Sequence, residues 1–310
     1  MNRSFPLPVV RRGSLSASLL FLASLAVPGP TSAQPASEAS ASAATAEQEP
    51  ADPNPGAIST SGGLDLQSTY MFRGIRQNST GIAAWPWLDL GFAAYSGDGA
   101  VKSVGINVGS WNSQHTGDTG ADGPSQKIWY ESDFYTSVGI GFGGGVSLAS
   151  TFTAYTSPNN TFATVKELMF KLALDDSARL GKAALKPYAI VARELGAAPG
   201  LGQADSGLEA GTYFEAGIAP GVTFPKASIA VPIKVGLSLS NYYEVAGVDE
   251  TFGFLSVSGI VTVPLGAASK YGSWNIHGGA EYQKLGTNTA SFNGGDRHRV
   301  IGSVGLGFAY

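Results

Sequence analysis

The chain ends in Arg299-Val-Ile-Gly-Ser-Val-Gly-Leu-Gly-Phe-Ala-Tyr310, a stretch in which apolar and small side chains alternate. One face would carry Val300, Val304, Leu306, Phe308 and Tyr310, and the other face mostly serine, glycine and alanine. Successive side chains of a β-strand point to opposite faces of the sheet. The pattern therefore predicts a final strand with one apolar face that ends in two aromatic residues.

A terminal strand of this kind resembles the closing strand of bacterial outer-membrane β-barrels. In that resemblance Phe308 and Tyr310 form the signal that the barrel insertion machinery reads. The prediction needs support from the rest of the chain, because many soluble proteins also end in a strand.

The composition fits a membrane barrel better than a soluble protein. Of 310 residues, 42 are glycine, about twice the usual frequency, while only 14% are charged and 43% are hydrophobic. A barrel gives this mixture because only the outward half of each strand must be apolar. With no cysteine, the chain has no disulfide, thiol nucleophile or Cys-ligated metal. A net charge of −4 gives no indication of a nucleic-acid surface.

Three regions follow one another along the chain. Residues 1–33 are predicted to be a signal peptide, because Arg11 and Arg12 precede a short apolar run and a small-residue cleavage site. The apolar run is shorter than the roughly 20 residues of a membrane anchor. Residues 34–60 are rich in Ala, Ser, Glu and Pro and are predicted to be a disordered leader. Residues 61–310 form the predicted barrel domain.

Alternating segments of about ten residues recur through the barrel domain. We therefore predict an all-β fold, a single antiparallel transmembrane β-barrel of about 12 strands, with 10 or 14 as alternatives. The segments are 63–73, 82–94, 102–112, 127–142, 146–156, 162–174, 185–195, 211–219, 228–243, 252–263, 273–284 and 298–310. A soluble β-sandwich is the alternative fold, but its strands average about five or six residues. Pro86, Pro187 and Pro232 lie inside these segments and predict bulges.

The connections between segments alternate in character. Those after odd-numbered segments are polar and often long, whereas those after even-numbered segments are mostly shorter. Bacterial barrels have an even number of strands, short periplasmic turns and longer outer loops. The sequence therefore predicts export through the inner membrane and a location in the bacterial outer membrane, surrounded by its lipid.

Residues 63–135 resemble a family of uncharacterised exported proteins of proteobacteria, described as conserved hypothetical proteins. The resemblance rests on Ser68-Thr-Tyr-Met-Phe-Arg-Gly-Ile-Arg-Gln77, on Pro86, on Gly109-Ser-Trp-Asn-Ser113 and on Glu131-Ser-Asp-Phe-Tyr135, and Glu167 also matches. Arg76 departs from the family pattern, which has a small polar residue there. The resemblance implies export and a barrel, and it implies no activity.

Alternation along the strands places a group of charged and aromatic residues in the lumen near the outer ends of the first five strands. An arginine facing carboxylates across a pore sets a transverse field that selects solutes, and aromatic rings beside it stack on flat solutes. The alternative is an aromatic girdle at the membrane interface, with the faces exchanged by a slip of one residue. The predicted binding residues are Arg73, Trp85, Trp87, Asp89, Trp111, Trp129, Glu131, Asp133, Tyr135 and Tyr155.

Further charged residues are predicted to face the lumen, where water or a cross-strand partner offsets their charge. They are Asp65, Glu167, Lys171, Lys234, His277 and Glu281. We predict no metal site and no cofactor. The sequence carries no Gly-x-Ser-x-Gly elbow or His-Glu-x-x-His motif, so it favours a protein that is not an enzyme.

Two functions from different classes remain. The first is a porin-like channel for passive passage of small hydrophilic solutes, with selection by the lumen charges left open. The second is a non-conducting structural or adhesive barrel, and an outer-membrane hydrolase is a distant third. The solute, the oligomeric state and the openness of the lumen do not follow from the sequence.

Overall fold

A computed structural model of the protein describes residues 56–78, 80–117, 127–195, 209–266 and 271–310. The predicted signal peptide, 1–33, and most of the predicted leader lie outside the described residues. The wall of the barrel begins at Ile58, so residues 58–60 of the predicted leader belong to the first strand.

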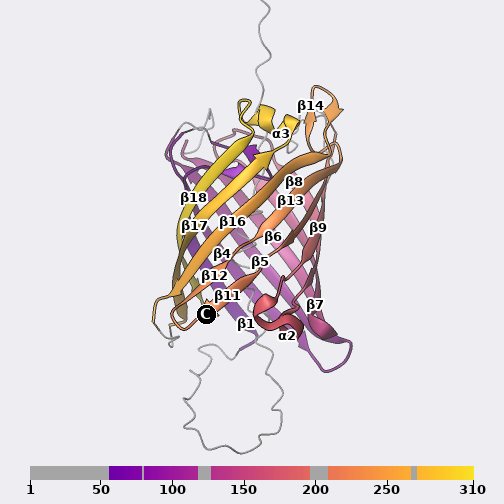
Figure 1. Ribbon diagram of the computed structural model, residues 1–310, viewed down its shortest axis with the longest axis vertical. Helices are drawn as coiled ribbons and strands as arrows, with labels where there is room; N and C mark the ends of the chain where they lie inside the picture. Colours follow the sequence, from indigo (N-terminus) through magenta and orange to yellow (C-terminus); the bar gives the residue numbers. More distant parts are fainter. Residues whose placement is uncertain (1–55, 79, 118–126, 196–208, 267–270) are drawn as a thin grey trace, which may run out of the picture.

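One antiparallel sheet closes on itself to form a barrel (Figure 1). Its strands are β1 (Ile58–Gln67), β4 (Ala83–Ser96), β5 (Val101–His115), β6 (Trp129–Phe142), β7 (Val146–Thr156), β8 (Val165–Leu174), β9 (Tyr188–Glu194), β10 (Thr212–Ile218), β11 (Gly221–Phe224), β12 (Ala227–Ala230), β13 (Ile233–Ser240), β16 (Phe252–Pro264), β17 (Ser273–Leu285) and β18 (His298–Ala309). The closing pairs are β1 with β18 and β16 with β17.

Two strands of the barrel are interrupted by proline. β12 and β13 both pair with β16 and are separated at Val231-Pro232, and β10 and β11 are separated at Ala219-Pro220. Proline lacks the N–H that a ladder needs, so each break lies where the sheet would require one. Counting each interrupted pair as one strand gives a closed barrel of 12 strands, which confirms the prediction over 10 or 14.

The two ends of the barrel differ. At one end of the barrel β1 begins and β18 finishes, and we call it the termini end. This end carries η1 (Gly143–Gly145), α2 (Ser177–Leu180) and η2 (Gly181–Ala183). The opposite end, the loop end, carries β2 (Met71–Phe72), β3 (Ile75–Arg76), β14 (Glu244–Val245), β15 (Val248–Asp249) and α3 (Thr287–Phe292). Figure 1 shows α3 and β14 at the upper end of the barrel, and α2 and the C-terminus at its lower end.

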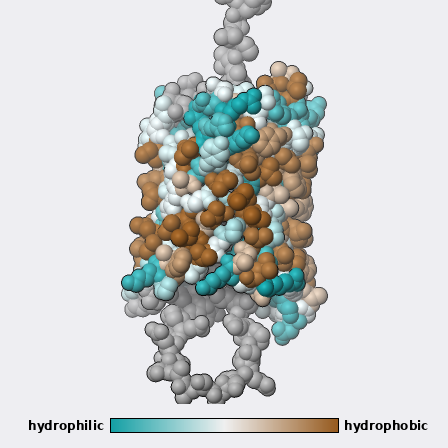
Figure 2. Space-filling view, viewed as in Figure 1, coloured by the Kyte–Doolittle hydropathy of each residue, from teal (hydrophilic) through white to brown (hydrophobic). Residues whose placement is uncertain are grey.

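The outer wall is apolar and the interior is polar. Val300, Val304 and Leu306 of the final strand are exposed on the outside, as its alternation predicted. Figure 2 shows hydrophobic atoms over much of the wall, with hydrophilic atoms gathered toward the two ends. In the part of the chain that the structure describes, no helix is long and apolar enough to cross a membrane. The fold is therefore a barrel with the apolar outer wall of a transmembrane protein.

Candidate functional site

A short hairpin folds into the barrel from the loop end. Tyr70–Asn78, which we call the inner hairpin, follows β1 directly and contains the paired strands β2 and β3. Its turn residues Arg73 and Gly74 have positive φ values of 46° and 82°, the combination that a type I′ hairpin turn requires. The sequence predicted a strand through Arg73, but β1 ends at Gln67 and this segment turns into the lumen instead.

Arg73 attaches the tip of the inner hairpin to the wall. Its Nη1 and Nη2 donate to the two carboxylate oxygens of Glu167 on β8 at 2.6 and 2.8 Å, and Nη1 also donates to the Tyr242 hydroxyl at 2.7 Å. The guanidinium lies 4.1 Å from the centre of the Tyr213 ring. Burial lowers the pKa of Arg73, but the Glu167 carboxylate and the Tyr242 and Tyr155 hydroxyls together outweigh burial, and the pKa is raised well above its ordinary value. Arg73 is therefore a fixed positive charge inside the barrel.

Four more hydrogen bonds hold the inner hairpin from different sides of the lumen. Tyr70 donates to Glu131 at 3.0 Å, and Tyr130 donates to the Gln77 side chain at 2.8 Å. The backbone carbonyl of Arg73 accepts from Tyr243 at 2.9 Å. The carbonyl of Gly74 accepts from Asn293, just after α3, at 2.8 Å. The hairpin thus bridges β6, the segment after β13 and the segment after α3.

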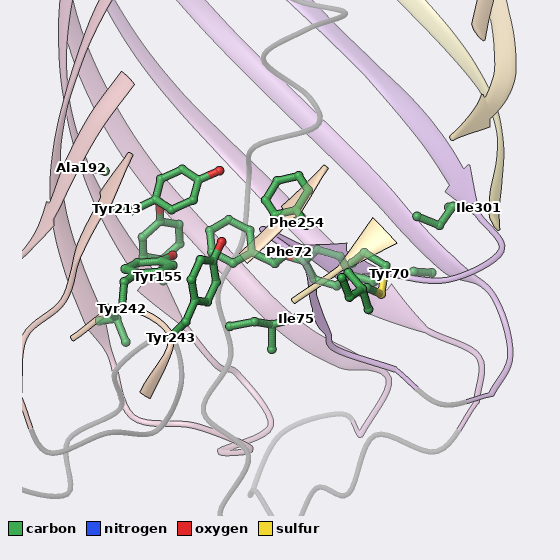
Figure 3. Close-up of a cluster of buried hydrophobic side chains, with 14 of the residues drawn as sticks. Tyr70, Phe72, Ile75, Tyr155, Ala192, Tyr213, Tyr242, Tyr243, Phe254 and Ile301 are labelled. Carbon is green, nitrogen blue, oxygen red and sulfur yellow. The ribbon is translucent and has the colours of Figure 1, made fainter. Parts of the chain in front are cut away.

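Aromatic rings fill the space around the inner hairpin. Tyr70 packs against Trp85 and Trp111, with ring centroids 5.1 and 5.6 Å away. Figure 3 shows Phe72 and Ile75 of the hairpin beside Tyr155, Tyr213, Tyr242, Tyr243 and Phe254. All of these side chains are buried, so the loop half of the lumen is packed.

A layer of charges lies in the lumen on β8, β9, β10 and β13. Glu215 accepts hydrogen bonds from Tyr188 at 2.8 Å and Tyr213 at 2.6 Å, and the Lys234 ammonium is 3.5 Å from it. The Lys171 ammonium lies 4.7 Å from the centre of the Tyr188 ring. This layer carries two lysines and one carboxylate, and Lys234 and Glu215 form an ion pair.

The facing wall, on β1, β4, β5, β6 and β17, carries two carboxylates with polar partners. Asp65 contacts His277 at 2.6 Å and accepts from Trp87 at 3.1 Å. Asp89 accepts from Asn107 at 2.7 Å and from Tyr135 at 3.0 Å. β1 lies five strands from β8 in the order of the sheet, so lysines and aspartates occupy opposite sides of the lumen. Such an arrangement produces a transverse field.

The lumen is packed toward the loop end and opens toward the termini end. Along β6 the inward-facing Glu131 and Asp133 are 0% exposed, whereas Ser137, Gly139 and Gly141 are half-buried. A Cβ placed on Gly139 would meet no atom within 4 Å. Its partner Gly105 would meet only the Phe92 carbonyl oxygen at 3.8 Å. In the part of the chain that the structure describes, small residues therefore leave free space in the termini half of the lumen.

The structure places nine of the ten predicted binding residues inside the barrel. Arg73, Trp85, Trp111, Glu131, Asp133 and Tyr155 surround the inner hairpin and are buried, while Trp87, Asp89 and Tyr135 lie nearer the termini end and are half-buried. The six further charged residues also face inward: Asp65, Glu167, Lys171, Lys234, His277 and Glu281. Their role in selecting a solute stays a prediction.

Trp129 is the tenth residue, and the prediction that it faces the lumen is wrong. A bulge next to Ser113 and Gln114 shifts the register, so Ser113 pairs with Glu131 but Gln114 pairs with Trp129. Tyr130 takes the inward position, and Trp129 lies on the outside with 38% of its surface exposed. Its indole donates to Asn112 at 3.2 Å. At this one position the side chain lies on the outer face, as the aromatic-girdle alternative requires, because a bulge exchanges the two faces of a strand.

Sequence reasoning missed several residues that contact the inner hairpin. Tyr242, Tyr243 and Asn293 lie in connections, where strand alternation gives no direction for a side chain. Tyr213 lies on β10 and faces inward. Alternation along that strand could have identified it, because Tyr213 and Glu215 share the buried face. The paired aromatics Tyr242-Tyr243 at a strand end were the available signal.

The histidines show no accessible catalytic arrangement. His115 is 2.9 Å from the Ser113 hydroxyl, but both are buried, and the imidazole stacks on Tyr130 beneath the inner hairpin. His277 contacts Asp65 and Asn275. Among the described residues, no three His, Asp or Glu side chains are grouped to hold a metal ion.

No protein-family model and no curated protein matches the chain. Solved structures with a similar fold include an outer-membrane channel from Pseudomonas putida F1, at 10% identity and a TM-score of 0.44, covering 85% of this chain and 100% of that one. The translocator domain of the autotransporter NalP from Neisseria meningitidis has 14% identity and a TM-score of 0.41, covering 83% and 89%. Outer membrane phospholipase A from Escherichia coli has 11% identity and a TM-score of 0.39, covering 80% and 89%. These three proteins differ in activity and are only distantly similar to this chain, so they carry no argument about its function.

Proposed function

We propose that the protein is an outer-membrane channel for the passive passage of small hydrophilic solutes, and that the inner hairpin closes its loop half in the conformation described. The observation that carries this proposal is the half-open lumen. Among the described residues, the termini half is lined by small residues that leave free space, and the loop half is filled by the inner hairpin and the aromatic rings around it. In a barrel of 12 strands, side chains alone need not fill the interior, because packing fills about eight strands and channels are common by sixteen.

The attachment of the inner hairpin supports a removable closure. β2 and β3 form a sheet of their own and do not pair with any barrel strand. The links described above between the hairpin and its surroundings are hydrogen bonds made by side chains and the ion pair between Arg73 and Glu167. Water can replace such polar contacts when the segment moves, whereas it cannot replace a strand of the wall. Opening therefore leaves the barrel itself intact.

The charges of the lumen indicate the solute class. Lys171 and Lys234 face Asp65 and Asp89 across the interior. A path with both signs of charge favours small polar or ionic solutes and disfavours apolar ones. We propose selection by this transverse field, with the aromatic rings of Trp87 and Tyr135 beside it.

A second function is a non-conducting barrel with a structural or adhesive role. The packed loop half favours it, because Glu131, Asp133 and Tyr213 around the inner hairpin are 0% exposed. The two functions differ in whether the hairpin ever leaves the lumen.

Export, membrane insertion and lipid contact are proposed from the sequence. We propose cleavage of a signal peptide at 1–33, insertion by the barrel machinery through Phe308 and Tyr310, and contact of the apolar wall with outer-membrane lipid. The termini end would then lie in the periplasm and the loop end outside. Membership of the exported family that the sequence resembles belongs to the same proposal.

Conductance tests the function directly. Residues 34–310 and a variant in which 71–76 are replaced by a Gly-Ser linker would be refolded in detergent and inserted into planar bilayers. We expect the variant to give discrete, salt-dependent steps larger than those of the native chain. A native chain without steps beside a conducting variant would describe a channel closed at rest. A folded, heat-modifiable variant without steps would overturn the channel and favour the structural barrel.

A further inference from the structure

The charges on the outer wall of the barrel have only one sign. Eight carboxylates lie on the described barrel strands, and every one faces the lumen: Asp65, Asp89, Glu131, Asp133, Glu167, Glu194, Glu215 and Glu281. Seven of them are buried, and Asp89 is bonded to inward-facing Asn107 and Tyr135. The exposed Asp, Glu, Lys, Arg and His residues on the outside of the same strands are all basic: Lys102, Lys166, Arg193, Lys284 and His298.

Four of these basic residues lie at the loop end. Lys166 and His298 are close to the starts of β8 and β18, and Arg193 and Lys284 are close to the ends of β9 and β17. We call these four residues the basic rim. The fifth, Lys102, lies at the termini end and donates to the backbone carbonyl of Asp98.

The basic rim consists of two pairs of neighbours. Lys284 and His298 are directly opposite each other on β17 and β18. On β8 and β9, Leu168 pairs with Arg193 and the Lys166 carbonyl accepts from Leu195, which places Lys166 and Arg193 diagonally side by side. Like charges on neighbouring strands repel. No carboxylate of the described residues forms an ion pair with any of the four.

The surroundings of the rim are those of a membrane interface. Exposed Val191 lies two residues before Arg193 on the same face of β9, and exposed Val300 lies two residues after His298 on the same face of β18. The ring of Tyr282 stacks on His298, and its hydroxyl is 2.7 Å from the imidazole Nδ1. Figure 2 shows hydrophilic atoms at the α3 end of the wall above hydrophobic ones. Amphipathic rings and basic side chains at this depth lie level with lipid headgroups.

We propose that the basic rim binds lipid headgroups whose phosphate groups give them a net negative charge, in the leaflet at the loop end of the barrel. The phosphate supplies the negative charge that the outer wall lacks, and the apolar side chains beside the rim contact the acyl chains. The proposal rests on the membrane placement in the proposed function and is independent of conduction, because the rim faces away from the lumen.

Native mass spectrometry of the full chain in detergent tests the proposal. The probe is lipid A, a diphosphorylated lipid, with phosphatidylcholine as the lipid without net charge. The variant K166Q/R193Q/K284Q removes three charges, and K102Q is the matched control at the other end of the wall. Each basic residue near an anionic lipid surface contributes enough for about a fivefold change in binding. We therefore expect the triple variant to bind lipid A about a hundredfold more weakly and K102Q to bind it as the native chain does.

A charge-keeping variant, a salt series and competing ligands serve as controls. A charge-keeping variant, K166R/R193K/K284R, should bind like the native chain, which separates loss of charge from loss of fold. Lipid A binding should weaken as salt rises. Unchanged binding by the triple variant would overturn the proposal. Equal binding of phosphatidylcholine, or displacement of lipid A by millimolar inorganic phosphate, would replace a lipid site with a nonspecific surface or a free-anion site. None of these results depends on conductance, so failure here is distinguishable from failure of the channel.

Discussion

Arg73 and Glu167 lie 94 positions apart in the sequence and form a two-point ion pair inside the barrel, with N–O distances of 2.6 and 2.8 Å. Both side chains are buried. Arg73 belongs to the inner hairpin and Glu167 to the wall, so this pair connects the movable part of the proposed channel to its fixed part.

Removing Arg73 should release the inner hairpin. R73A leaves Glu167 buried without its cation, and breaking a buried pair in this way costs about 3–5 kcal/mol. We expect a lower free energy of unfolding in urea and more frequent or larger conductance steps. R73K should be intermediate, because an ammonium cannot reproduce the fork of the guanidinium.

The double variant R73M/E167M is the matched control for that experiment. Replacing both partners by apolar residues of similar size is often neutral, so this variant should recover most of the lost stability and stay closed. If R73A conducts and unfolds as the native chain does, the ion pair does not hold the hairpin.

Gly305 should resist substitution, while Gly139 should accept it. Asp65 on β1 and His277 on β17 both pair with Gly305 of β18 and meet across it. A Cβ on Gly305 would lie 2.2 Å from the Asp65 carboxylate and 2.4 Å from the imidazole. G305A should therefore displace the pair and destabilise the barrel by about 1–3 kcal/mol.

G139A is the control for that comparison, because its Cβ would meet no atom within 4 Å. We expect a change in stability within about 0.5 kcal/mol, as for other sites away from packed features. G139W extends the test to function, since a large side chain in the free space should lower the conductance of a hairpin-deleted channel. Equal thermal melting of G305A and the native barrel would show that the bridge across Gly305 contributes nothing.

Strand alternation was enough to predict the wall of the barrel. The terminal stretch pairs with both β1 and β17, with its valines and leucine outside, as its period of two required. The ladder is interrupted at Pro232, because proline cannot supply a ladder hydrogen bond, but the predicted bulge is absent there. β12 and β13 pair with β16 in one register, and Pro86 lies within β4 without a register shift. These features are local and depend on side-chain direction along one strand.

The inner hairpin could not be predicted in the same way. Residues 68–73 continue the alternation of β1, so nothing local indicates that the strand ends at Gln67. The turn into the lumen depends on partners distant in sequence, including Glu167, Tyr242 and Asn293. The residues predicted to form a selective mouth were mostly found in the lumen, but several of them contact the hairpin instead of lining an open path.

The bulge next to Trp129 predicts a difference between two tryptophans that alternation placed on the same face. Trp129 lies outside with its ring exposed, and Trp111 is buried in the lumen. In vesicles of lipids that carry bromine on their acyl chains, a chain retaining only Trp129 should lose fluorescence strongly. A chain retaining only Trp111 should be quenched little. Similar quenching of the two would contradict the exchange of faces at the bulge.

Alkaline pH should open the channel by ionising the tyrosines that hold the inner hairpin. Burial raises the pKa of both Tyr242 and Tyr243 well above the ordinary value. A phenol released to water ionises near pH 10, so above that pH the packed state holds more protons than the released state. Stability of the packed hairpin is therefore complete below about pH 10 and falls as the pH rises further. Arg73 does not contribute to this loss, because its own pKa is raised well above the ordinary value.

Conductance and tyrosinate absorbance, measured together from neutral to strongly alkaline pH, check this expectation. The two should rise over the same interval and reverse together on return to neutral pH. Y243F removes one ionisation and the hydrogen bond to the Arg73 carbonyl, which costs about 1 kcal/mol. It should conduct more at neutral pH but respond less steeply to alkali than the native chain. Conductance that stays constant while the buried tyrosines ionise would show that their release does not open a path, and the packed loop half would then be a permanent part of the barrel.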